Sequence, residues 1–147
     1  RCVAAARGWP GTLGRVWARA GVSAPSGGAA GFPVPVRPVR RCGMDYLDQV
    51  AIMRHDSWSK VDQWRNDGGF RLILFTTRGV SSYLDYRYGA DDILLFGRES
   101  AGVPDEVAVA AEARLVIPIK PGLRSLNVAM AAAMALGEAL RQTSSAV

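Results

Sequence analysis

Three short loop sequences in the second half of the chain carry residue types that could bind a ligand. Residues 97–102 read Gly-Arg-Glu-Ser-Ala-Gly, residues 117–119 read Ile-Pro-Ile, and residues 124–127 read Arg-Ser-Leu-Asn. Each lies next to a short apolar stretch, as expected where a strand of a parallel sheet ends and its loop can meet a ligand. Three such loops at one edge of a sheet would form a binding site.

The first loop combines open backbone with one carboxylate. Gly97 and Gly102 have no side chain, so the amides between them can approach a ligand closely. Glu99 could accept hydrogen bonds from a ligand or orient the neighbouring loop. In the alternative reading, the glycines only mark the exit of a strand and the entry of a helix, and Glu99 is a surface acid.

The second and third loops offer apolar contact and hydrogen-bonding groups. Pro118 lacks an amide hydrogen, which leaves neighbouring carbonyls free to accept from an amino group, and Ile117 could contact a flat ring. Ser125 could cap the helix that follows, and Asn127 could reach back toward a ligand. Capping alone would also explain these two polar residues individually.

The elements that must position these loops follow from the pattern of apolar residues. Strands are predicted over residues 50–53, 70–75, 92–96 and 114–119, and helices after Ser57, over 82–86, over 104–111 and over 126–142. Strands that recur about every 20 residues, with helices between them, are typical of an α/β fold with a parallel sheet.

The last predicted helix, residues 126–142, is rich in alanine and methionine and is apolar on every face in its first turns. A helix of this kind must be covered on several sides. We therefore expect it to pack both on its own sheet and against a partner subunit. A helix buried within a single subunit is the alternative.

Composition separates a basic beginning from a slightly acidic body. The chain has 147 residues and a formal charge of +5, which predicts one domain with its own core. Residues 1–44 hold arginines and no acidic residue, so they could bind RNA phosphate, or they could form a solvated tail.

Cys2 and Cys42 lack metal-ligand or redox spacing and are expected to stay reduced. No membrane span or signal peptide is recognisable, which predicts a cytoplasmic protein.

Residues 1–30 are unusually rich in glycine, alanine and arginine, and they show neither helical nor strand periodicity. We expect this segment to lack regular structure, with the folded domain spanning residues 31–147.

The loop motifs together resemble the signature loops of the SPOUT superfamily of RNA methyltransferases, and within it the TrmL-like tRNA ribose 2'-O-methyltransferases. The stretch Arg40-Arg41-Cys42-Gly43-Met44-Asp45-Tyr46 is similar to the family's Arg-Arg-Ala-Gly-Leu-Asp-Tyr, and Arg54-His55 resembles its Arg-His pair. The similarity runs over residues 31–143.

This resemblance implies a fold and an activity. The fold would be an α/β parallel sheet with a deep trefoil knot near the carboxyl terminus. The activity would be transfer of a methyl group from S-adenosylmethionine to the ribose 2'-hydroxyl of the wobble nucleotide of tRNA, with no metal. Members of this type act as homodimers with the anticodon stem-loop across both subunits.

The resemblance also assigns roles to residues of this chain. The implied cofactor-binding residues are Phe75, Thr76, Gly97, Glu99, Ile117, Ser125, Leu126 and Asn127. The implied catalytic residues are Arg1, Glu99 and Asn127. The implied RNA-binding residues are Arg54, His55, Arg78 and Arg124.

The first part of the chain departs from the family. The family's first strand and its Asn-x-Gly-Asn-x-x-Arg loop find no match, and Gly137 stands where a tyrosine is common. One hypothesis is that the first part of the chain is a misassigned or frame-shifted reading of GC-rich DNA. A second is a catalytically impaired protein that binds RNA or dimerises and keeps the cofactor pocket. An unrelated α/β dimerisation module without a cofactor is a third reading.

Overall fold

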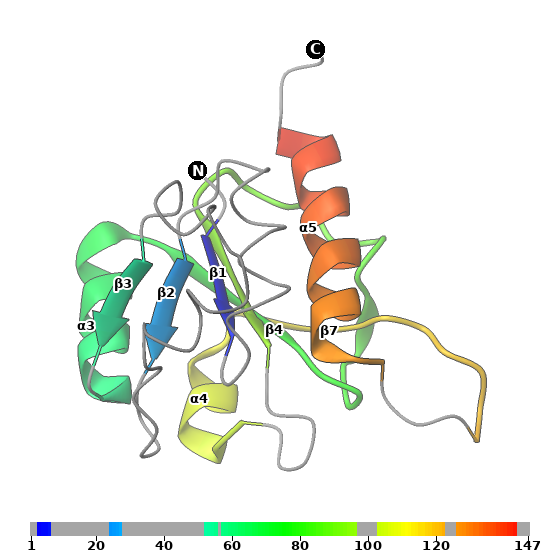
Figure 1. Cartoon of the computed structure of the whole chain (residues 1–147), viewed down its shortest axis with the longest axis horizontal. Helices are drawn as coiled ribbons and strands as arrows, with labels where there is room; N and C mark the ends of the chain where they lie inside the picture. Colours follow the sequence, from blue (N-terminus) through cyan, green and yellow to red (C-terminus); the bar gives the residue numbers. More distant parts are fainter. Residues whose placement is uncertain are drawn as a thin grey trace, which may run out of the picture.

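The computed structural model describes residues 3–6, 24–27, 52–55, 57–96, 103–122 and 126–143, with backbone alone for the first three ranges and for Ala129. In these residues a parallel sheet carries helices on both faces (Figure 1). The predicted α/β architecture is confirmed. None of the helices in the described ranges is long and apolar enough to cross a membrane.

All strand pairs in the described residues are parallel. The strands are β1 (Val3–Ala6), β2 (Ala24–Gly27), β3 (Ile52–His55), β4 (Arg71–Phe75), β5 (Ser81–Ser82), β6 (Asp92–Phe96) and β7 (Ala113–Val116). Five form a sheet in the order β1-β6-β4-β7-β5, while β2 pairs with β3 and lies beside β1. At the centre, Phe75 of β4 is level with Phe96 of β6 and with Leu115 of β7.

Local sequence signals set the helix boundaries. Helix α3 (Trp58–Gly68) begins where the Ser57 hydroxyl accepts a hydrogen bond from the amide of Lys60 at 3.4 Å. It ends at Gly69, whose φ of 67° is in the left-handed region that glycine tolerates. The start after Ser57 was predicted from sequence. The other described helices are α4 (Asp105–Ala110) and α5 (Val128–Thr143).

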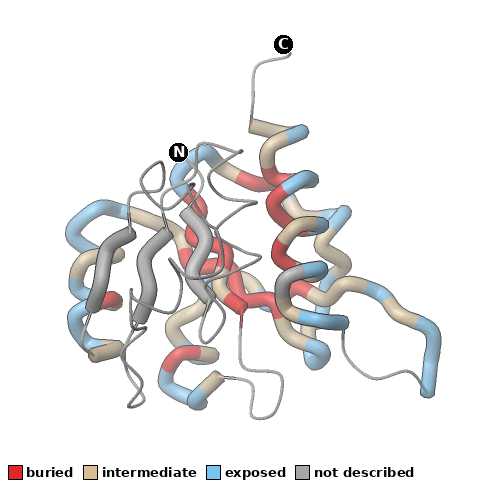
Figure 2. Tube along the Cα trace, in the orientation of Figure 1, coloured by how far each residue is buried: buried red, intermediate tan, exposed pale blue. Residues whose placement is uncertain are grey.

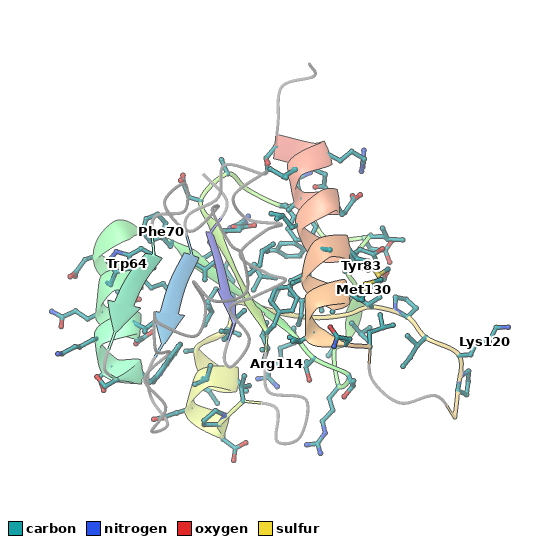
Figure 3. The ribbon with its side chains drawn as sticks, viewed as in Figure 1. Trp64, Phe70, Tyr83, Arg114, Lys120 and Met130 are labelled. Atoms are coloured by element: carbon teal, nitrogen blue, oxygen red, sulfur yellow. The ribbon has the colours of Figure 1, made fainter. Side chains whose placement is uncertain are left out.

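Side chains that alternate along the strands divide the core into two layers. On one face, Ile73, Phe75 and Leu94 pack with the small residues of α5, and Figure 2 shows buried residues along this contact. The alanines of α5 permit close approach to the sheet. On the other face, Leu72 and Ile93 pack with residues of α3 and its neighbours, including the Trp64–Phe70 pair, whose ring centroids lie 4.9 Å apart (Figure 3).

The prediction of a short helix over residues 82–86 is wrong. Ser81 and Ser82 instead form β5, and the Tyr83 amide donates to the Val116 carbonyl at 3.0 Å. The edge of β7 supplies partners for these backbone groups, so the segment pairs as a strand and then turns.

Residues 1–30 also differ from the expectation of an unstructured segment. They contain β1, which pairs with β6, and β2, which pairs with β3. Strands pair through backbone groups, and every residue type except proline has both the donor and the acceptor. Short strands that contain alanine or glycine can therefore form without an alternating pattern of apolar side chains in the sequence. Residues 32–38 contain three prolines, which favour an extended connector, but they lie outside the described residues.

A buried carboxylate holds the amino-terminal edge of the sheet. Asp92, which is 1% exposed, accepts hydrogen bonds from Arg71 Nε at 2.7 Å, from Arg71 Nη2 at 2.9 Å and from the Gly89 amide at 2.8 Å. The hydrogen bond to Asp92 raises the pKa of Arg71. Arg71 also lies over the Tyr86 ring, 5.7 Å from its centroid. This cluster ties the start of β4 to the start of β6 and to the segment between them.

The carboxyl-terminal end of α5 is fastened to the same segment. Gln142 accepts from the Tyr88 amide and donates to the Tyr86 carbonyl, both at 3.0 Å. It also donates to Glu138 at 2.7 Å, and Glu138 pairs with Arg141. Hydrogen bonds from Arg141 and Gln142 lower the pKa of Glu138 to about 2, so this acceptor is ionised at neutral pH.

Removing the charge of Asp92 is expected to destabilise the fold. In Asp92→Asn, one buried oxygen becomes a donor facing other donors, which should lower the free energy of unfolding by about 2 kcal/mol in chemical denaturation. The control is Asp62→Asn, which breaks a partly exposed pair with Arg65 on α3 and should cost about 0.5 kcal/mol or less. Equal losses in the two variants would contradict the account.

Candidate functional site

The carboxyl ends of β4, β6 and β7 meet at one edge of the sheet, because these adjacent strands are parallel. The rings of Phe75 and Phe96, at the ends of β4 and β6, stack with centroids 4.7 Å apart and an interplanar angle of 19°. Phe75 is 7% exposed and Phe96 is 2% exposed. The stack therefore belongs to the core shared with α5, at the level where the loops leave this edge.

The loop after β4 is fastened to β7 through its backbone. The Thr76 amide donates to the Leu115 carbonyl at 2.9 Å, and the Val80 amide donates to the Arg114 carbonyl at 3.1 Å. Within the loop, the Thr76 hydroxyl accepts from the Arg78 amide at 3.2 Å. This leaves the hydroxyl hydrogen of Thr76 available to donate to another group.

Gly79 makes this attachment sterically possible. A Cβ atom built on Gly79 would lie 2.4 Å from the carbonyl carbon of Leu115 and 2.5 Å from the amide nitrogen of Val116. Both are backbone atoms of the last two residues of β7, so they cannot move aside as a side chain could. The loop sits in its observed place only because residue 79 has no side chain.

Helix α5 begins beside this edge. The Asn127 carbonyl accepts from the Ala131 amide at 3.0 Å, which starts the helix, and Leu126 and Asn127 are exposed. Val128 and Ile117 pack against the same core cluster, so the first turn of α5 lies near the end of β7, as Figure 1 shows.

The structure thus brings together part of the site predicted from sequence. Thr76 and Ile117 lie at the ends of neighbouring strands, with Leu126 and Asn127 on the adjoining start of α5. Phe75 lies at the same edge, but its buried ring belongs to the core, so it would meet a ligand chiefly through its backbone.

The other predicted residues are described less fully or not at all. Arg78 is exposed on the loop after β4, whereas Arg54 and His55 lie in β3, for which the backbone alone is described. The remaining predicted residues, which are Arg1, Gly97, Glu99, Arg124 and Ser125, lie outside the described residues.

Sequence reasoning missed Gly79. Its only signal was its place at the end of the Thr76-Thr77-Arg78-Gly79 loop, and a glycine there is equally consistent with an ordinary turn. Its steric role depends on β7, which lies more than 30 residues further along the chain.

A methyl group at residue 79 should displace this loop. We expect Gly79→Ala to lower the free energy of unfolding by about 1 to 3 kcal/mol, the usual cost of overpacking, and to speed hydrogen exchange of the Thr76 and Val80 amides. The control is Ser59→Ala, because Ser59 is exposed on α3 and alanine favours a helix. A Gly79→Ala variant as stable and as protected as the wild type would refute the close-packing argument.

Comparison with known proteins gives the family of this chain. The sequence model of the SpoU rRNA Methylase family matches residues 11–137. The chain is 55% identical to a tRNA (cytidine(34)-2'-O)-methyltransferase of Beijerinckia indica subsp. indica over 132 residues, which cover 90% of this chain and 82% of that protein.

Solved structures give the same family. One, which concerns the 2-OH methylation of C/U34 on tRNA, superposes with a TM-score of 0.83 at 32% identity and covers 96% of this chain and 94% of its own. Another is the SpoU methyltransferase AviRb from Streptomyces viridochromogenes in complex with the cofactor AdoMet, with a TM-score of 0.81 at 26% identity, covering 97% of this chain and 60% of that one. With the family model matching most of its length, the chain belongs to the SpoU methylase family.

Proposed function

We propose that this protein transfers a methyl group from S-adenosylmethionine to the ribose 2'-hydroxyl of nucleotide 34, the wobble nucleotide of tRNA. The observation that carries this proposal is the 55% identity, over 90% of the chain, to a protein named for that reaction. The meeting of three loops or strand ends at one edge of the sheet supports it independently.

The chemistry of the described residues fits this cofactor. Ile117 and the exposed side chain of Leu126 offer apolar contact for an adenine ring. Because Pro118 has no N–H group, neighbouring carbonyls can accept a hydrogen bond from the adenine amino group. The Thr76 hydroxyl and the Asn127 side chain offer polar contacts for the ribose and the amino-acid part. When bound, S-adenosylmethionine supplies a methyl group on a positively charged sulfur.

The protein's contribution is to position the reactants and to ease loss of the hydroxyl proton. Asn127, exposed at the start of α5, is proposed to orient the reacting ribose together with Glu99. Arg1 is proposed to help the 2'-hydroxyl lose its proton. Gly97 and Ser125 are proposed to complete the cofactor pocket.

The tRNA anticodon stem-loop is the proposed partner, in the cytoplasm. Arg78 is exposed on the loop after β4 and forms no salt bridge within the described residues, which suits contact with phosphate. Arg54, His55 and Arg124 are proposed to act with it.

We further propose a homodimer in which α5 of each subunit lies in the interface. One face of α5 is buried against the sheet, but Met130 is 59% exposed and Met134 is 39% exposed, with exposed Gly137 one turn further on. These residues form an apolar stripe that we call the methionine stripe, at the spacing of one helix face. A second copy would cover it.

The trefoil knot is also a proposal. It is supported by the family membership and by the contacts of α5, which begins near the end of β7 and is fastened by Gln142 to the segment before β6. An experimental structure in which residues 126–143 pass through an earlier loop would agree with it, and an unthreaded chain would overturn it.

A second candidate function is RNA binding without methyl transfer. It is favoured by one observation, namely that the family's Asn-x-Gly-Asn-x-x-Arg loop finds no match in the sequence. Both candidates keep the cofactor site, so activity alone separates them.

Methyl transfer is tested directly with tRNA and isotopically labelled S-adenosylmethionine. We expect label in the 2'-O-methyl group of nucleotide 34, identified by mass spectrometry of nucleosides and fragments. A tRNA carrying a 2'-deoxy nucleotide at that position is the control and should stay unlabelled. Binding of cofactor and tRNA without label would favour the second candidate.

The homodimer is tested by charging the methionine stripe. Met130→Asp is expected to convert a dimer to a monomer in sedimentation, because a carboxylate would be buried in an apolar interface. The control is Val109→Asp, since Val109 is 77% exposed on α4, away from α5. A wild-type chain that sediments as a monomer would contradict the proposal.

A further inference from the structure

Apart from Lys60 on α3, the basic side chains of the described residues fall into two groups. Arg65, Arg71 and Arg141 each form a salt bridge of 2.7 Å, with Asp62, Asp92 and Glu138 respectively. Within the same part of the chain, no salt bridge engages Arg78, Arg87, Arg114 or Lys120. This second group has charge available for an external partner.

Most of the second group lies at the edge that holds the candidate site. Arg78 follows β4, Lys120 follows β7, and Arg114 is level with Leu74 near the end of β4. The Arg114 carbonyl accepts from the Val80 amide, so Arg114 lies beside the loop that carries Arg78. Arg87 is different, because it precedes β6 and lies at the opposite edge.

Arg114 is exposed for a structural reason. Its neighbours Ala113 and Leu115 pack toward the α5 face, so alternation directs Arg114 to the other face. At that position no described helix covers it, and it is exposed. Acidic Asp105 and Glu106 begin α4 on this side of the sheet but form no salt bridge with Arg114, and they limit the basic region on the α4 side.

Lys120 is carried away from the body of the domain. It lies between Pro118 and Pro121, which restrict the backbone of the loop, and Gly122 turns the chain with φ of 85°. Figure 3 shows Lys120 near the tip of the loop between β7 and α5, with Arg114 lying closer to the end of β4. Arg114 and Lys120 thus lie apart from each other, which suits a row of phosphates better than a single small anion.

We propose that Arg114 and Lys120, with Arg78, form a track that binds the sugar-phosphate backbone of the substrate tRNA outside the nucleotide that is methylated. This inference rests on the proposed function and deepens it by adding two positioning residues. The track would hold the anticodon stem-loop in register while the cofactor site engages one ribose. It contributes affinity and orientation, and it takes no part in the transfer step.

The experiment compares Arg114→Gln, Lys120→Gln and the double variant with the wild-type protein, using full-length substrate tRNA. Each lost phosphate contact should weaken tRNA binding about fourfold at about 0.15 M salt, and the double variant should weaken it about fifteenfold. The slope of log affinity against log salt should fall by about 0.7 per contact. The KM for tRNA should rise in parallel, with kcat and calorimetric affinity for S-adenosylmethionine unchanged.

The matched control is Arg87→Gln, which removes an arginine of the same exposure class, also without a salt bridge, from the opposite edge. It should leave affinity and salt slope unchanged. A double variant with wild-type affinity and slope would overturn the inference, as would an equal loss in Arg87→Gln. The inference would also be overturned if the double variant dissociated into monomers in sedimentation while its remaining dimer bound tRNA with wild-type affinity. Failure of the proposed function would be distinguishable, because the wild-type protein itself would then not bind or methylate tRNA.

Discussion

Parallel pairing of β4 with β6 on one side and with β7 on the other organises this fold. Because the three strands run in one direction, the segments that follow them all leave from the same edge. The chain then returns to this edge once more at the start of α5, since Val128 and Ile117 share one core cluster. Residues from distant parts of the sequence are thereby collected into one region.

The two edges of the sheet differ in how their charged side chains are placed. At the amino-terminal edge, Asp92 is buried and its oxygens accept three hydrogen bonds, so its charge is fully engaged within the fold. At the carboxyl-terminal edge, Arg78, Arg114 and Lys120 form no salt bridge with any other residue that the structure describes. The internal pairing at one edge fixes the strands, which in turn hold the loops of the other edge in place.

The sequence predicted those elements whose signals are local. Ser57 and Gly69 bound α3 because capping is decided within a few residues, and the apolar run of residues 92–96 became β6. It did not predict β1, β2 or β5, because their pairing depends on backbone groups of distant strands.

The candidate site shows the same division. Thr76, Ile117 and Asn127 were found from loop composition, since polar and proline residues after apolar runs are visible in the chain itself. Gly79 and Arg114 could not be found in this way. The need for glycine comes from the backbone of β7, and the free charge of Arg114 follows from which helices leave that face uncovered.

Chemical-shift mapping of backbone amides during titration with S-adenosylmethionine tests whether the cofactor binds at the carboxyl-terminal edge of the sheet. We expect the largest changes on residues 76–80, on the segment after β7 and on the first turn of α5. Largest changes at residues 87–92, around Asp92 on the opposite edge, would contradict it, as would a spectrum that saturating cofactor leaves unchanged.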